Sequence, residues 1–166
     1  MLYSLLNIRD RKQQFSRVSA HCDIPCKIYD PITAQLAVLT MIRMVDLLEQ
    51  LAAKSDPSPS DHAQFSRLVA EKETHGRKVK EEINVIWGDY IKQPQLDKFP
   101  ELHELVHSIM LNASQAKQHI SRDVCVSLLE KVNQFADIFW RTKGLTTYLA
   151  SCPYPPSETL IYPKLA

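Results

Sequence analysis

Apolar residues recur at helical spacing through most of the chain, and this periodicity predicts four long helices. The first follows Asp30-Pro31, an N-cap aspartate with proline at the first helical position, and extends to about residue 54. The second begins at Ser58, which opens a capping box, and the third and fourth begin at Pro100 and Ser121. Amphipathic helices joined by short connections predict an all-α, up-down four-helix bundle.

Some segments depart from this simple pattern. The first helix is apolar on nearly every side between Leu36 and Leu51, which favours contacts beyond its own bundle and hence oligomerisation. The second helix has a highly charged middle that contains Gly76, where we expect a kink or break. Residues 92–99 are expected to form a loop. From residue 144 onward the tail has four prolines and no helical period, which predicts an irregular C-terminal arm.

The composition supports a helical protein and excludes several classes of function. Only 3 glycines occur in the 166 residues, in keeping with regular helix. The formal net charge of +1 lacks the basic excess of a nucleic-acid-binding protein. The 4 cysteines are too few for a disulfide scaffold, so a reducing, cytoplasmic location is expected. No apolar run approaches the roughly 20 residues of a membrane span, so no membrane partner is expected.

The beginning of the chain resembles a removable leader. Its apolar cluster is too short for a secretory signal, and its charges are mainly basic. Val18 and Ala20 place small side chains before His21, as at sites cut by signal-peptidase-like proteases. We therefore expect a cleavable leader over 1–20, a domain of metal-binding hook and four-helix bundle over 21–143, and a C-terminal extension over 144–166.

A dense group of donor side chains follows the leader, in the sequence HCDIPCKIYDP over residues 21–31. A Cys-x-x-x-Cys pair alone is a weak metal signal, but here His21 directly precedes Cys22. Pro25 directly precedes Cys26, so a tight turn is expected to bring both sulfurs toward the histidine. Cleavage before His21 would add a terminal amine, and the next peptide nitrogen can bind metal once deprotonated. Amine, amide nitrogen and two thiolates form a square-planar set that suits Ni(II) or Cu(II) better than zinc.

The segment HCDIPCKIYDP resembles the nickel hook of the nickel-containing superoxide dismutase family, whose mature chains begin H-C-D-x-P-C-G-x-Y-D-P. Two later segments, VIWGDYIKQPQLDKFPELHELV (85–106) and FADIFWRTK (135–143), are also similar to that family. The resemblance implies a homohexamer of four-helix bundles that converts superoxide to O2 and H2O2 by Ni(II)/Ni(III) cycling. It also implies a dedicated maturation protease that cuts before His21.

The same resemblance assigns roles to the hook residues. His21 would supply the terminal amine and an axial imidazole, Cys22 an amidate and a thiolate, and Cys26 the second thiolate. These anionic donors would bring the redox potential of nickel into the range that superoxide disproportionation needs. In some family members a carboxylate and an arginine orient the imidazole, and the corresponding positions here are Ala37 and a position near His75. Arg67 or His75 are the candidates to replace them.

Further residues are expected around the metal. Tyr29 and Tyr90 match family tyrosines that would restrict access and order water, with Asp89 beside the second of them. Asp23 and Pro25 are expected to hold the turn of the hook. Lys27 stands where the family has glycine, so a positive φ would be strained there by about 1 kcal/mol or more. Its charge could instead attract superoxide.

The sequence is also compatible with three other functions. An uncut or altered hook would make a non-catalytic module that binds Ni or Cu, and a disulfide between Cys22 and Cys26 would make a thiol switch. His103, Glu104 and His107 spell H-E-x-x-H on a predicted helix, the zinc-peptidase signature. Because so short a pattern arises often by chance and no sheet is expected to bind a peptide, the peptidase is the remote alternative.

Overall fold

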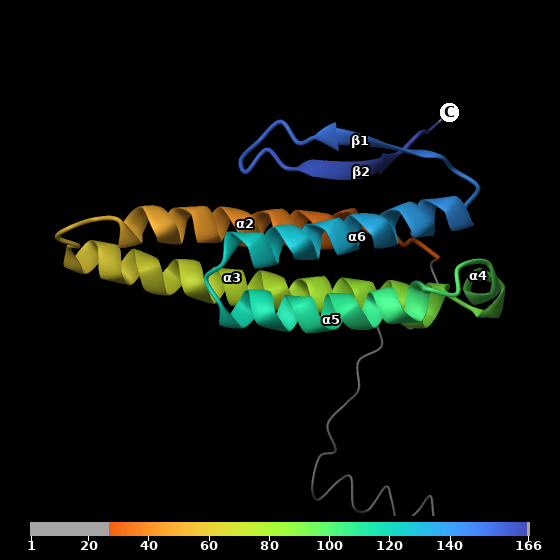
Figure 1. The fold of residues 1–166 in the computed structure, drawn as a ribbon, viewed down its shortest axis with the longest axis horizontal. Coiled ribbons are helices and arrows are strands. Elements are labelled where there is room, and N and C mark those ends of the chain that lie inside the picture. The colour runs from red at the N-terminus through yellow and green to blue at the C-terminus, as the bar shows by residue number, and fades with distance from the viewer. Residues whose placement is uncertain (1–26, 166) are drawn as a thin grey trace, which may run out of the picture.

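The computed structural model describes residues 27–165 and shows four long helices packed side by side (Figure 1). The elements are α2 (Ile32–Ala52), α3 (Pro59–Val85), the π-helix η1 (Ile86–Tyr90), α4 (Gln93–Lys98), α5 (Leu102–Gln118), α6 (Arg122–Thr142), β1 (Thr147–Ser151) and β2 (Thr159–Pro163). Consecutive long helices contact each other, and α6 closes the bundle against α2. The expected up-down four-helix bundle is therefore confirmed.

Three of the long helices begin close to where the sequence predicts, and α5 begins at Leu102, two residues after the expected Pro100. The Asp30 carboxylate accepts a hydrogen bond of 2.8 Å from the Ile32 N–H at the start of α2. Ser58 and Asp61 form a complete capping box at the start of α3. The Ser121 hydroxyl accepts from the first turn of α6. Each of these side chains satisfies backbone N–H groups that a helix start leaves without an intrahelical partner.

The core lies between the four helices. Its centre is formed by fully buried aliphatic and aromatic side chains, among them Val38, Ile42, Val79, Ile83, Ile109, Leu128 and Phe135. Burial of such side chains is the main source of stability in a domain of this kind. Cys125 lies in this core, and burial raises the pKa of its thiol to about 11, which marks it as a packing residue. None of the helices described has both the length and the apolar character to cross a membrane.

Gly76 does not kink α3, which runs unbroken from Pro59 to Val85. The glycine instead allows close packing of three helices. A Cβ atom placed there would lie 2.3 Å from Cγ of Lys117 on α5 and 3.1 Å from Cε of Met41 on α2. The irregularity of this region comes later, where the helix widens into the π-helix η1.

A buried lysine joins α3 to the end of α5. Lys72 is 1% exposed, and its ammonium donates to the carbonyls of Ala116 and Lys117 at 2.6 Å and of His119 at 2.9 Å. These carbonyls lie at the C-terminal end of α5, where the helix has no further N–H groups to offer them. Burial lowers the pKa of Lys72. The charge is thus held in the bundle by hydrogen bonds to a helix end.

Two segments differ from expectation. Residues 93–98, expected to lie in a loop, form the short helix α4, which has Pro94 in its first turn. The C-terminal segment, expected to be an irregular arm, forms an antiparallel hairpin of β1 and β2. Threonine, tyrosine, leucine and isoleucine concentrate in its strands, while most of its prolines lie in the turn between them. The prediction of an irregular arm was wrong, because the prolines of the turn obscured the strand pattern on either side of it.

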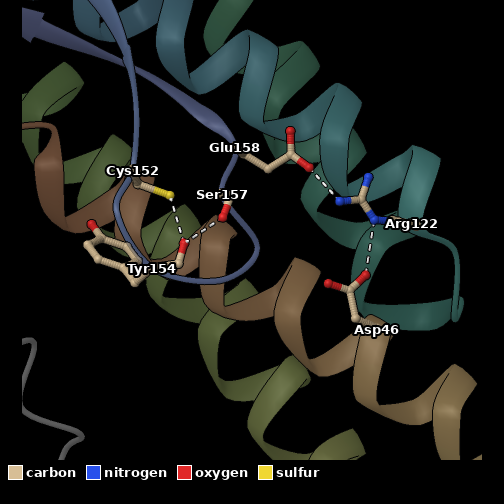
Figure 2. A network of polar contacts seen from close by, with 6 residues as sticks. All are labelled: Asp46, Arg122, Cys152, Tyr154, Ser157 and Glu158. Atoms are coloured by element: carbon tan, nitrogen blue, oxygen red, sulfur yellow. Dashed lines mark hydrogen bonds and ion pairs between the residues drawn. The ribbon is translucent and has the colours of Figure 1, made fainter.

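The hairpin is fastened to the bundle by polar contacts. Arg122 on α6 pairs with Asp46 on α2 at 3.0 Å and with Glu158 just before β2 (Figure 2). Nearer the start of α2, the fully buried Gln35 donates to the Ile161 carbonyl of β2 at 3.1 Å and to Asn133 of α6 at 2.8 Å. The hairpin therefore covers part of the apolar surface of α2. That surface was expected to contact other subunits.

Candidate metal site and its tyrosine pair

The expected metal hook lies just before the first residue that the structure describes. The proposed ligands and turn residues are outside the described residues: His21, Cys22, Asp23, Pro25 and Cys26. The description begins at Lys27, which directly follows Cys26. Lys27 has φ of +59°, in the left-handed region that glycine adopts most easily. Lys27 therefore adopts the positive φ whose strain was expected at this position. The left-handed conformation costs a residue with a side chain about 1–2 kcal/mol.

Two tyrosines meet at the end of the bundle where the hook joins it. The ring centroids of Tyr29 and Tyr90 are 5.7 Å apart, with the ring planes tilted by 44°. Tyr29 lies two residues after the turn at Lys27, and Tyr90 is the last residue of η1. Behind them, the buried Phe139 of α6 lies 5.1 Å from the Tyr90 ring. The structure thus brings together the two tyrosines that the sequence pairs, although 60 residues lie between them in the chain.

The hydrogen bonds of Tyr90 fix the direction of its phenol proton. The Tyr90 hydroxyl lies 2.7 Å from Oγ1 of Thr142, and that Oγ1 donates its own proton to the Phe139 carbonyl at 2.6 Å. Because the threonine hydroxyl has a single proton, Tyr90 must be the donor to Thr142. The phenol oxygen therefore keeps its lone pairs as acceptors for water at the site.

A lysine that the sequence analysis missed adds charge to this pair. The Lys143 ammonium lies 4.2 Å from the centroid of the Tyr90 ring and 5.2 Å from that of Phe139. A cation over aromatic faces is stabilised by their negative electrostatic potential. Thr142 and Lys143 belong to the segment FADIFWRTK, and its similarity to the family was the one feature of the sequence that pointed to these two residues. Their contact with Tyr90 depends on how α6 packs, which the spacing of residues does not show.

The other candidates around the site lie as follows. Asp89 is exposed on η1, and Trp87 on the same turn donates from its indole N–H to Nδ1 of His103 at 3.0 Å. Ala37 is 2% exposed in the core, and the Nδ1–H of His75 donates to the Glu71 carbonyl at 2.9 Å. Arg67 is exposed on α3.

The H-E-x-x-H segment is not built as a zinc site. Nδ1 of His103 accepts the Trp87 proton, so in the neutral ring the proton is on Nε2, which is then unable to bind metal. Within residues 27–165, no group of three His, Cys, Asp or Glu side chains lies close enough to hold a metal ion. A catalytic zinc needs three protein ligands, so the described residues give no support to the peptidase alternative.

A double-mutant cycle tests the contact that orients Tyr90. Replacing Thr142 by valine and Tyr90 by phenylalanine, singly and together, is expected to show a coupling of about 1 kcal/mol in the free energy of unfolding. The measurement is urea unfolding followed by circular dichroism. The pair Thr142→Val and Tyr148→Phe serves as the control, because Tyr148 lies on β1 and its change should be additive. Additive effects at Thr142 and Tyr90 would show that the hydrogen bond does not hold the phenol.

Comparisons with known proteins identify relatives of this chain. The sequence model of the family described as nickel-containing superoxide dismutase matches residues 16–143. The chain is 36% identical over 126 residues to superoxide dismutase [Ni] of Streptomyces coelicolor, covering 76% of this chain and 90% of that protein. It is 35% identical over 127 residues to the protein of the same name from Streptomyces seoulensis, covering 76% of this chain and 91% of that protein.

Solved structures show the same fold. A native nickel superoxide dismutase structure superposes with a TM-score of 0.64 at 32% identity, covering 74% of this chain and 99% of that chain. A nickel-containing superoxide dismutase with nickel ligation corresponding to the oxidised state gives a TM-score of 0.64 at 32% identity, over 75% of this chain and 99% of that one. The hook sequence, the helical bundle and these matches lead to one conclusion: the chain belongs to the nickel-containing superoxide dismutase family.

Proposed function

We propose that this chain disproportionates superoxide, so that one superoxide anion is oxidised to O2 while a second is reduced and takes up two protons to give H2O2. The observation that carries the proposal is the family match over residues 16–143, which includes the whole segment HCDIPCKIYDP. Nickel, when bound, supplies the one-electron couple that both halves of the reaction need. The protein has to bind that ion, limit access to it and provide protons.

The donors of the hook fit nickel chemically. His21 would bind through its terminal amine and its imidazole, Cys22 through its amide nitrogen and thiolate, and Cys26 through its thiolate. Thiolate and amidate donors favour the higher oxidation state of a late transition metal and its tetragonal geometry. The left-handed backbone of Lys27 turns the chain immediately after the last ligand, which supports a closed loop held by Asp23 and Pro25.

The tyrosine pair has two tasks in this proposal. The packed rings of Tyr29 and Tyr90 would leave room for a small anion and water and exclude larger reductants. The phenol oxygen of Tyr90, whose proton goes to Thr142, would accept a hydrogen bond from a water that delivers protons. Lys143, over the Tyr90 ring, and Lys27 place positive charge near the entrance, which favours an anionic substrate. Asp89, exposed beside Tyr90, would add to the water-binding surface.

Maturation and assembly complete the proposal. A protease would remove residues 1–20 and so create the terminal amine of His21. The mature chain would assemble as a homohexamer, for which Leu36, an apolar residue of α2 that stays exposed, gives support. The small number of cysteines supports a reducing, cytoplasmic location.

The terminal amine can be tested with two chains that differ by one residue. One begins at His21, and the other keeps Ala20 in front of it, so that the amine of His21 becomes an amide. After nickel loading, the chain that keeps Ala20 is expected to lose dismutase activity by about tenfold or more, because the His21 nitrogen is then a neutral amide that has to lose its proton before it can bind nickel. Superoxide consumption by pulse radiolysis and bound nickel by mass spectrometry are the measurements, with helicity by circular dichroism as the control for folding.

The outcomes of this comparison separate the competing functions. Equal activity of the two chains would contradict the amine ligand. A chain beginning at His21 that binds nickel without consuming superoxide would identify a metal-binding module. A chain that binds no nickel and whose intact mass shows the loss of two hydrogens would identify a Cys22–Cys26 thiol switch.

A further inference from the structure

The C-terminal hairpin stands on its edge against the bundle, with β2 toward the helices and β1 away from them (Figure 1). The backbone of Ile161 in β2 points at the helices. Its N–H donates to Oδ1 of Asn133 at 3.3 Å, and its carbonyl accepts from Nε2 of Gln35 at 3.1 Å. The outer edge of β2 is thus bonded to side chains of α2 and α6.

This orientation fixes which groups of β1 face outward. Ile161 is opposite Leu149 in the register, and because the Ile161 backbone points away from β1, the two form a non-hydrogen-bonded pair. In an antiparallel ladder such pairs alternate with hydrogen-bonded ones. Consistent with that phase, the Cys152 N–H donates across the hairpin to the Glu158 carbonyl at 2.9 Å. The backbone groups of Leu149, and of Thr147 and Ser151 on either side, therefore point away from β2.

The outer edge of β1 lacks the charged side chains, the proline and the bulge that often protect edge strands. Within residues 27–165, the sheet contains only β1 and β2, so no further strand lies beside β1. Leu149 is 64% exposed and Tyr148 is 46% exposed. Residues 144–157 contain no charged side chain, and β1 itself contains no proline. Natural proteins usually block such an edge with lysine, proline or a bulge, because it pairs readily with another strand.

We propose that β1 is a docking edge for β1 of a second copy of this chain, paired antiparallel about a two-fold axis at Leu149. The outward groups of Leu149 would exchange hydrogen bonds with those of Leu149 in the second copy. Thr147 would pair in the same way with Ser151 of the other chain. The two hairpins would then form one continuous four-stranded antiparallel sheet.

A second copy fits this edge for three reasons. The outward backbone groups are symmetric about Leu149, so one strand offers what an identical antiparallel strand requires. The segment is uncharged, so two copies bring no like charges together. In the proposed register, the large Tyr148 lies opposite the small Ala150 of the other chain, which avoids a clash of aromatic rings.

The test uses the full chain and two variants at the centre of the edge. Leu149→Pro removes the outward N–H without touching a hydrogen bond to β2, and Leu149→Lys places a charge on the edge. By analytical ultracentrifugation, the unaltered protein is expected to have at least twice the mass of either variant. The ratio applies where β1 joins chains that other contacts do not already hold together, and it does not depend on nickel or activity. Leu111→Lys is the matched control, because Leu111 is 56% exposed on α5.

Hydrogen exchange provides a second readout at individual amides. In concentrated protein the Leu149 amide should exchange slowly, and dilution should increase its exchange rate by tenfold or more. The Tyr148 amide, bonded inside the hairpin, should be unaffected by dilution. A Leu149 amide that exchanges fast at every concentration would overturn the proposal, as would equal masses of the unaltered protein and both Leu149 variants together with unchanged Leu149 exchange on dilution. A loss of mass in Leu111→Lys alone would also overturn it, since the contact would then lie on α5.

Discussion

Replacing Cys26 by serine is expected to reduce dismutase activity by more than about 100-fold, with no loss of the helical bundle. A thiolate is a soft, anionic ligand, whereas a serine hydroxyl stays neutral near pH 7 and binds nickel weakly. Cys22→Ser should have the same effect. Both residues precede α2, and neither substitution changes a residue of the described core.

The matched control is Cys152→Ser. Cys152 is 3% exposed in the hairpin turn, and its sulfur donates to the Tyr154 carbonyl at 3.3 Å, a contact that a serine hydroxyl can also make (Figure 2). Its activity per bound nickel should therefore equal that of the unaltered protein. Nickel content, superoxide consumption and circular dichroism are measured on chains beginning at His21. Full activity in Cys22→Ser or Cys26→Ser would refute the assignment of the sulfur ligands.

Replacing Lys72 by methionine is expected to lower the free energy of unfolding by about 3 kcal/mol. Methionine keeps most of the aliphatic volume, so the loss of packing is small. Two larger effects oppose each other. Removing a buried charge recovers its desolvation cost, and the same cost is the reason that burial lowers the pKa of Lys72. The carbonyls at the end of α5, however, lose charged hydrogen bonds of about 1.5–3 kcal/mol each, and this loss dominates because the ammonium contacts three of them.

Lys78→Met provides the comparison for Lys72. Lys78 is exposed on the same helix, so its replacement should change the free energy of unfolding by less than about 0.5 kcal/mol. Urea denaturation of both variants at pH 7 gives the two values. If Lys72→Met were as stable as the unaltered protein, the buried ammonium would not be holding the end of α5.

Local sequence signals predicted most of the bundle. Helix starts at Ser58 and Ser121 depend on side chains that bond within their own turn, so they can be recognised without knowledge of the fold. The C-terminal hairpin was missed because its proline-rich turn masks two short strands. The buried role of Lys72 was missed because a lysine in a charged stretch has the same pattern whether it faces solvent or a neighbouring helix.

The residues of the candidate site also differ in how far the sequence predicted them. The ligands His21, Cys22 and Cys26 were proposed from adjacent donors in one short segment, and their positions lie outside the described residues. Tyr29 and Tyr90 were paired by family resemblance, and the structure places their rings in contact. The contributions of Thr142 and Lys143 could not be predicted, because they arise only when the end of α6 packs beside η1.

The Arg122 clamp also couples two contacts of the fold to one side chain. Asp46 lies on α2, Arg122 on α6 and Glu158 just before β2, so a single guanidinium joins three segments that are far apart in the chain. Loss of this guanidinium would leave two carboxylates without their shared counter-charge. The hairpin and the α2–α6 contact would therefore weaken together rather than one at a time.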